Sequence, residues 1–294
     1  MPSIASREAR AGWLFAAPGF LLYLLFALTP VLVTLGFSLT QIDRFTWQVD
    51  FVGADNFFYV WTDRHFWRSF GNTFEFIFLA VAGNVGLGLL VAVLLDRAMP
   101  KTLLYALRFA YFLPVLVAAA LVSLVWKFLY STDLGILNYY LRSVGLPGVG
   151  WLTDGGVAMV SVVILDVWKH FGFFMIILLA ALQAVPRSLI EAAQLDGASA
   201  ARVFWHIKLP TIAPVLLFCI TYATIGGLQV FDSVRILTNG GPGDATRVMV
   251  LYMYEQTFGA QDIGSGSAVA FSLLLTIIAV TAVQYGYGKR VTRI

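Results

Sequence analysis

Three ionisable side chains, Asp166, Lys169 and His170, lie within five residues of one another inside an otherwise apolar stretch. On a helix, Asp166 lies one turn before Lys169 and His170, so one face could carry a carboxylate acceptor beside two donors. Trp168 lies among them and offers an aromatic face on which a sugar ring could stack. Charged groups within a membrane are costly and mark either a solute path or a buried pair. The cluster is therefore interpreted as a pathway lining, or as structural residues, in which case Asp166 and Lys169 pair with each other or hold a neighbouring helix.

Further polar candidates lie in two other hydrophobic stretches. Glu75 and Asn84 are nine residues apart in one of them and are expected on about the same face of a helix. They would either line the path or bond to an adjacent helix. A second group lies toward the external end of a later stretch, at the depth of an outer vestibule, and comprises Gln229, Phe231 and Asp232.

A glycine and proline loop follows that vestibule group directly. It contains Asn239, Gly240, Gly241 and Pro242. Such a loop is more often a plain turn than a ligand cradle.

The stretches that carry these residues are long enough to cross a membrane. With 60% hydrophobic and 12% charged residues, the chain has too little polar surface for a soluble globule. A spanning helix needs roughly 20 mostly apolar residues. The sequence predicts an all-α, polytopic membrane protein, one domain over residues 1–294, with six spans at about 12–42, 69–95, 109–126, 157–185, 209–233 and 263–288.

Basic residues predict the orientation of these spans. With both termini in the cytoplasm, eleven Lys and Arg residues lie inside and seven outside, as the positive-inside rule requires. Arg7 and Arg10 precede the first apolar run as they would in a signal peptide. Apolar cores of signal peptides are about 7 to 15 residues long, and this run continues uncharged to Ile42, so a retained helix is expected.

Several kinds of chemistry are not expected of this chain. The single cysteine, Cys219, cannot form an intramolecular disulfide and is expected to pack. No phosphate-binding loop occurs, since the Gly288 and Lys289 pair is followed by Arg290. The three histidines are scattered, which disfavours a metal site or a membrane enzyme. No basic stripe supports nucleic-acid binding.

Residues 187–210 form a polar segment between two apolar stretches. Pro186 suits the first turn of a helix, Gly197 its left-handed end, and Ser199 the N-cap of a second short helix that reaches about Lys208. This hairpin would form a slim cytoplasmic knob that offers carboxylates to a partner's groove. The alternative is an amphipathic helix that rests on lipid headgroups, which explains the glycine poorly.

The same segment closely resembles the EAA loop of ATP-binding cassette importer permeases. The match covers Glu191, Ala192, Ala193, Asp196, Gly197, Ala198, Leu209 and Pro210. The run that begins Phe51-Val-Gly-Ala-Asp-Asn-Phe is similar to a signature of carbohydrate importer permeases of the maltose and glycerol-phosphate type. Other matches are Asn72-Thr73, Trp168 with Leu179-Ala-Ala-Leu-Gln-Ala-Val-Pro186, and Asn239-Gly240-Gly241-Pro242 with Thr246.

The resemblance implies the first permease of a heterodimeric pair in a bacterial-type inner membrane. Its implied partners are a second homologous permease, two ATPase subunits that bind ATP and Mg, and an extracytoplasmic solute-binding protein. It implies that the matched hairpin residues couple ATP hydrolysis to transport. It also favours a pathway role for Asp166, Lys169 and His170, and suggests that the Asn239 loop orders the external mouth.

The cargo and one rival mechanism stay open at this point. An anionic cargo such as glycerol phosphate would favour exposed Lys169 or Arg235, whereas a neutral sugar would favour tryptophan and amide contacts. An ion-coupled secondary transporter could use the Asp166 cluster as a proton relay. That alternative predicts no use for the hairpin.

Overall fold

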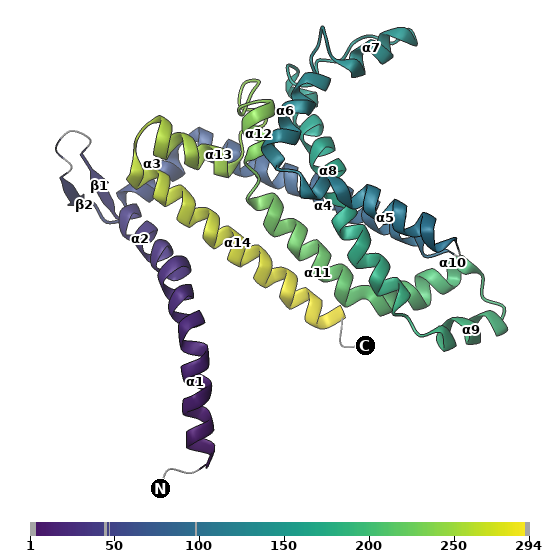
Figure 1. The fold of residues 1–294 in the computed structure, drawn as a ribbon. Coiled ribbons are helices and arrows are strands. Elements are labelled where there is room, and N and C mark those ends of the chain that lie inside the picture. Colours follow the sequence, from purple (N-terminus) through teal and green to yellow (C-terminus); the bar gives the residue numbers. More distant parts are fainter. Residues whose placement is uncertain (1–3, 44–45, 47, 98, 292–294) are drawn as a thin grey trace. The chain divides into compact units, whose positions relative to one another are not determined.

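The computed structural model describes residues 4–43, 46, 48–97 and 99–291 and is almost entirely helical (Figure 1). The fold class predicted from the sequence is therefore confirmed, with one two-stranded antiparallel hairpin added to it. The elements are α1 (Ile4–Tyr23), α2 (Thr29–Ser38), β1 (Thr40–Ile42), β2 (Val49–Phe51), α3 (Asp55–Thr62), α4 (Arg64–Leu95), α5 (Lys101–Leu116), α6 (Ala119–Leu129), α7 (Ile136–Ser143), α8 (Gly155–Gln183), α9 (Arg187–Leu195), α10 (Ala200–Val203), α11 (Leu209–Leu228), α12 (Asp232–Leu237), α13 (Met249–Tyr254) and α14 (Ile263–Val291), with π-helical turns at Leu24–Leu28, Phe204–Lys208 and Glu255–Gly259.

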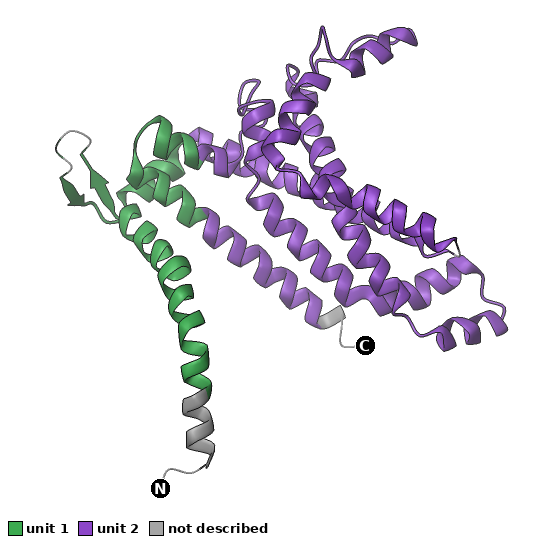
Figure 2. Ribbon diagram, in the orientation of Figure 1, with its two compact units in different colours: residues 1–63, 253–272 green, residues 64–252, 273–294 purple. Residues whose placement is uncertain are grey.

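Two compact units make up the chain (Figure 2). Unit 1 contains residues 1–63 and 253–272, and unit 2 contains residues 64–252 and 273–294. Helix α14 contributes its first turns to unit 1 and the remainder to unit 2.

Five helices of the described chain are long and apolar enough to cross a membrane: Gly12–Ser38, Arg64–Leu95, Gly155–Gln183, Ala200–Leu228 and Ile263–Lys289. A sixth crossing requires that α5 and α6 together make one span, although they are bent by 97°. The third predicted span, 109–126, is therefore not a single straight helix.

The bend has a local cause. Pro114 lies in the last turn of α5 and has no N–H to donate, and Val117 and Ala118 both have extended ψ angles, of 138° and 133°. The helix therefore ends here, and the carbonyl groups of its last turn lose the donors that a further turn would supply, although the Val117 N–H still donates to the Pro114 carbonyl at 3.3 Å.

Lys169 of α8 satisfies two of those carbonyls. Its ammonium group donates to the carbonyl oxygens of Pro114 at 3.4 Å and Val115 at 3.2 Å. The side chain is 5% exposed. A cation at a helix C-terminus also opposes the partial negative charge of the aligned peptide dipoles. Lys169 is therefore a structural part of the break between α5 and α6.

Unit 2 packs around α4 and α8, which lie side by side along much of their length. Two glycines of α4 permit the close approach: a Cβ on Gly83 would meet Val167 at 2.5 Å, and one on Gly88 would meet the backbone of Met175 at 3.1 Å. Two apolar clusters result. One includes Phe76 and Leu165, and the other includes Cys219, whose predicted packing role is confirmed.

In unit 1, the residues that match the carbohydrate-permease signature hold the β-hairpin in place. Asn56 at the start of α3 is 9% exposed and donates to the carbonyl oxygens of Ser38 at 3.0 Å and Thr40 at 2.9 Å. Gly264 of α14 lies so close to Thr40 that a Cβ would contact its carbonyl oxygen at 2.5 Å. The asparagine thus ties the end of α2 to the strand that follows it.

The Lys169 contact yields a stability prediction. Lys169→Met should lower the melting temperature of the purified protein, because the Val115 carbonyl would lose its lysine donor, and an enclosed acceptor left without a donor costs about 1–3 kcal/mol. Lys127→Met, an exposed lysine in the last turn of α6, is the matched control and should leave the melting temperature unchanged. Equal melting temperatures for both variants, measured by fluorescence-detected unfolding in detergent, would contradict the structural role of Lys169.

Candidate coupling hairpin and solute cavity

The predicted hairpin begins with α9 and turns at Gly197. The φ of Gly197 is +77°, in the left-handed region that favours glycine. The N–H of Ala198 donates to the carbonyl of Ala193 at 2.9 Å, and the N–H of Gly197 donates to that of Gln194 at 3.0 Å. These two bonds form a Schellman motif. The sequence prediction of a glycine-terminated helix is confirmed.

The second arm differs from the prediction of a separate short helix. Ser199 caps it as expected, since its Oγ accepts from the N–H of Arg202 at 3.4 Å. The helix then continues without a break through a π-helical turn and Pro210 to Leu228. A proline in a helix removes one backbone donor, and the wider turn before it accommodates that loss. The fifth span therefore starts at Ala200, and it ends at Leu228 rather than at residue 233.

The tip of the hairpin presents acidic groups beside small side chains. Glu191 and Asp196 are exposed, and neither carboxylate makes a hydrogen bond or ion pair within the described part of the chain. Beside them lies a hollow of about 370 Å³ lined by Ala193, Asp196, Ala198, Arg202, Val203, His206 and Ile207. A partner's side chain has both room and acceptors here.

The base of the hairpin is tied to α4. The ammonium group of Lys208 lies 2.5 Å from the carboxylate of Asp96, directly after the end of α4, and both side chains are largely buried. Leu209, one of the matched residues, packs against the second apolar cluster. The arm is therefore anchored both through its own helix and through this ion pair.

A cavity of about 370 Å³ lies in unit 2 among α4, α5, α8 and α11. Four of the candidates predicted from the sequence line it: Asn84, Asp166, His170 and Gln229. These residues come from three helices that are distant in sequence. This cavity is called the solute cavity below.

Asp166 is the centre of the polar contacts in the solute cavity. One carboxylate oxygen accepts from the side-chain amide of Asn84 at 2.8 Å. The other lies 3.1 Å from Nδ1 of His170, which is also 3.0 Å from the backbone carbonyl of Asp166. Lys169 points away from this network toward α5. The Asp166 and Lys169 pair considered from the sequence is not formed.

The remaining pathway candidates lie outside the solute cavity. Trp168 is 42% exposed and packs on Trp126, with ring centroids 5.5 Å apart. Phe231 packs against the first apolar cluster, and Asp232 is exposed at the start of α12.

Glu75 and Asn84 do not share a face. Nine residues at about 100° each rotate by half a turn, so the expectation that they lie together was wrong. Glu75 is exposed and Asn84 is 4% exposed.

Sequence reasoning missed three aromatic residues that line the solute cavity, Phe173, Phe174 and Tyr222. Phe173 and Tyr222 line it, and their ring centroids are 5.2 Å apart. Tyr222 has a polar tip within the apolar stretch of α11, which is the signal that could have drawn attention to it. The pairing of the two rings depends on how α8 and α11 pack, which their sequences do not encode locally.

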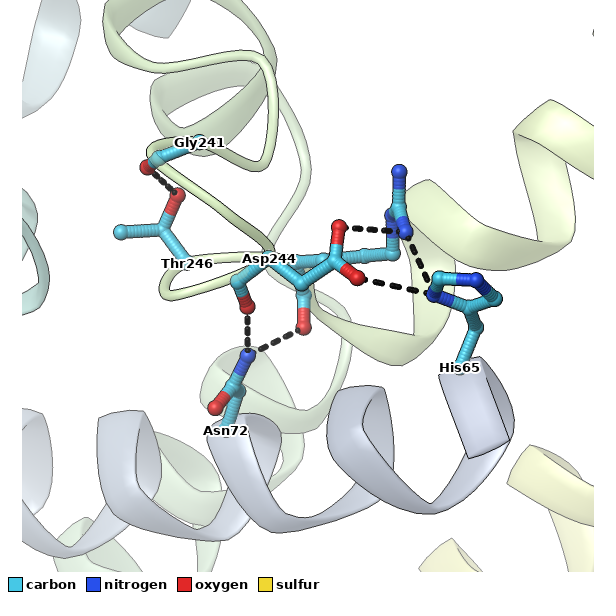
Figure 3. A network of polar contacts seen from close by, with 6 residues as sticks. His65, Asn72, Gly241, Asp244 and Thr246 are labelled. Atoms are coloured by element: carbon cyan, nitrogen blue, oxygen red, sulfur yellow. Dashed lines mark hydrogen bonds and ion pairs between the residues drawn. The ribbon is translucent and has the colours of Figure 1, made fainter. Parts of the chain in front are cut away.

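The loop that carries Asn239 and Gly240 is ordered by hydrogen bonds. Both residues have positive φ, 52° and 85°. Thr246 closes the loop, because its hydroxyl donates to the carbonyl of Gly241 at 2.9 Å (Figure 3). Pro242 follows a cis peptide bond.

Helix α4 holds this loop from one side. Asn72 donates to the carbonyl oxygens of Asp244 at 2.6 Å and Arg247 at 2.9 Å (Figure 3). His65 Nδ1 lies 2.8 Å from the Asp244 carboxylate, which Arg247 also contacts at 2.5 Å. The loop is therefore a fixed element of unit 2 rather than a free turn.

Among the described residues, no group of three or more His, Cys, Asp and Glu side chains is arranged to hold a metal ion.

Comparison with known protein families gives a match over most of the chain. Residues 84–293 match the model of the family described as "binding-protein-dependent transport system inner membrane component".

Full-length relatives agree with this match. The chain is 35% identical over 96% of its length to the trehalose/maltose transport system permease protein MalF of Thermococcus litoralis, covering 95% of that protein. It is 34% identical over 99% of its length to the sn-glycerol-3-phosphate transport system permease protein UgpA of Agrobacterium fabrum, covering 98%. It is 34% identical over 95% to the lactose transport system permease protein LacF of Rhizobium radiobacter, covering 94%.

A solved structure shares the fold. The match is to a chain in the crystal structure of a bacterial ABC transporter involved in the import of the acidic polysaccharide alginate, with a TM-score of 0.84 and 22% identity. It covers 99% of this chain and 100% of that one. The family match and the full-length relatives together show that the chain belongs to the inner membrane components of binding-protein-dependent ABC transport systems.

Proposed function

We propose that this chain is a permease subunit that moves a carbohydrate-like solute across the inner membrane, driven by ATP that partner subunits hydrolyse. The observation that carries the proposal is the hairpin, whose acidic tip is exposed and whose second arm runs unbroken into a membrane helix. The complete importer would contain a second homologous permease, two ATPase subunits that hold ATP and Mg, and an extracytoplasmic binding protein. This chain would be the first permease of the pair, with both termini in the cytoplasm.

The hairpin would act as a lever. Closure of the ATPase subunits on ATP would shift the docked tip, and Ala200–Leu228 would carry that displacement into the membrane as one rigid helix. Coupling of this kind requires only that the two conformations of the permease bind the closed ATPase with different affinity. The matched residues from Glu191 to Ala198 would form the docking face, and Leu209 and Pro210 would join it to the span.

The solute cavity would hold the cargo during passage. Its paired aromatic rings, Phe173 and Tyr222, suit the apolar face of a sugar, while Asp166, Asn84 and Gln229 offer polar contacts for hydroxyl groups. Phe231, Asp232 and the Asn239 loop would belong to the external vestibule. Relatives are named for trehalose and maltose, lactose and glycerol phosphate, so the cargo is proposed as a sugar or a related polyol.

The first experiment measures ATPase activity of the assembled complex in nanodiscs. The cognate binding protein, loaded with each of a panel of sugars and glycerol phosphates, should stimulate hydrolysis with one cargo and not with the others. Uptake driven by a proton gradient, with no copurifying ATPase, would replace this proposal with an ion-coupled secondary transporter.

A second prediction concerns the turn of the hairpin. Gly197→Val should sharply reduce cargo-stimulated ATPase activity and uptake, because a β-branched residue with left-handed φ is strained by at least about 1–2 kcal/mol and would distort the tip. Gly145 has a similar φ of +80° and equally open surroundings, but lies in the loop after α7.

Gly145→Val is therefore the matched control and should leave coupling intact. Both variants should reach the membrane at wild-type levels, as judged by immunoblot. An equal loss of coupling in the two variants, or none in Gly197→Val, would refute the docking assignment.

A third prediction concerns the aromatic wall of the solute cavity. Tyr222→Ala should lower uptake about two- to tenfold, the equivalent of the ~0.5–1.5 kcal/mol of an aromatic contact, while the complex still assembles. Tyr105→Ala removes a tyrosine that is 62% exposed on α5 and should leave uptake unchanged. If Tyr222→Ala acts only by preventing assembly, the residue is a packing element rather than a solute contact.

A further inference from the structure

The ionisable residues near the solute cavity differ in position: Asp166 and His170 line it, whereas Lys169 does not. Of the described residues that line the solute cavity, only Asp166 and His170 can carry a charge near neutral pH. His170 lies against the Asp166 carboxylate at 3.1 Å. With His170 protonated the pair sums to zero, and with His170 neutral it carries one negative charge. With Asp166 ionised, the groups that line the solute cavity therefore sum to zero or to one negative charge.

The nearby cation is turned away. Lys169 is not among the lining residues, is 5% exposed, and donates to the carbonyl oxygens of Pro114 and Val115. The peptide dipoles that end at those carbonyls offset part of its charge. An anionic cargo entering the solute cavity would thus meet the Asp166 carboxylate, and the one lining group that can become a cation, His170, already lies against that carboxylate.

Asn84 adds a second, independent observation. It is 4% exposed, and its Oδ1 has no hydrogen-bond partner within the described part of the chain. The amide orientation is fixed, because Nδ2 donates to the Asp166 carboxylate at 2.8 Å and a flipped amide would set two acceptors against each other. A buried acceptor without a donor is costly. Because Oδ1 is itself enclosed, the part of Asn84 that bears on selectivity is Nδ2, which holds the Asp166 carboxylate in place as an acceptor.

We propose that the solute cavity selects uncharged polyhydroxyl solutes and disfavours phosphorylated or carboxylated ones, with Asp166 as the group that determines this selectivity. The proposal rests on the proposed function, since it assumes that the cargo passes here, and it narrows the cargo to neutral sugars. A phosphate ester carries about 1.5 to 2 negative charges at neutral pH and would be repelled by the same carboxylate that accepts sugar hydroxyls. The hydroxyl donors of a neutral sugar match the acceptor oxygens of Asp166.

The test measures the charge preference directly and needs neither transport nor ATP. Ala223 lines the solute cavity, and Ala223→Cys places a thiol there in the full-length chain within the assembled complex in nanodiscs. The rate of labelling is measured with three methanethiosulfonate reagents that carry a trimethylammonium, a hydroxyethyl or a sulfonate group. The parent protein, whose Cys219 is fully buried, gives the background rate.

After correction for each reagent's reaction with a free thiol, the cationic reagent should label about tenfold faster than the anionic one, as expected for one charge several ångströms away. The hydroxyethyl reagent should be intermediate. Asp166→Asn, which keeps an oxygen acceptor for Asn84, should bring the cationic and anionic rates close together.

Asp133→Asn removes an exposed carboxylate from the external loop and should leave the ratio unchanged. Equal or reversed rates in Ala223→Cys alone would overturn the proposal, even if Asp166→Asn failed to assemble. A ratio that survives Asp166→Asn would overturn the role of Asp166. A normal ratio in a complex that no loaded binding protein stimulates would instead locate the failure in the proposed function.

Discussion

Backbone groups inside a membrane must find partners within the protein, because the hydrocarbon core offers no water to bond them. In this chain that requirement is most demanding between α5 and α6, where Pro114 and the extended residues after it end a helix early. Lys169 donates to the carbonyl groups of Pro114 and Val115 at this break. Because Lys169 bonds to α5, Asp166 contacts Asn84 and His170 instead. The negative charge of the solute cavity is therefore linked to the side-chain contact at one helix break.

The same polar residues lie between the two apolar clusters of unit 2. Ala80 and Leu165 belong to the first cluster, and Val85 and Phe174 to the second, while Asn84 and Asp166 fall between them along α4 and α8. Apolar packing on both sides fixes the two helices, with glycines where they approach most closely. Polar side chains between them are thereby held in position without closing the space that they line.

The segment that carries Asn84 is connected by hydrogen bonds and ion pairs to both ends of unit 2. On the hairpin side, a Schellman motif closes the turn at Gly197, and the helix that starts at Ala200 is unbroken. Lys208 also contacts Asp96 after the end of α4. At the other end of α4, Asn72 and His65 hold the loop around Asp244 (Figure 3). The segment from His65 to Asp96 therefore contacts both this loop and the base of the hairpin.

The sequence by itself determined the membrane class, the approximate location of most of the long helices and the glycine-ended turn of the hairpin, because hydrophobic length and left-handed glycine are local properties. It did not show the break between α5 and α6 or the start of the fifth span at Ala200. It did indicate Asn84, Asp166, His170 and Gln229, since polar groups in apolar stretches are rare. Only the tertiary structure decided what each one contacts. Lys169 and Asp166 are three residues apart, yet one bonds to α5 and the other to α4, because their partners are chosen by helix packing rather than by spacing along one helix.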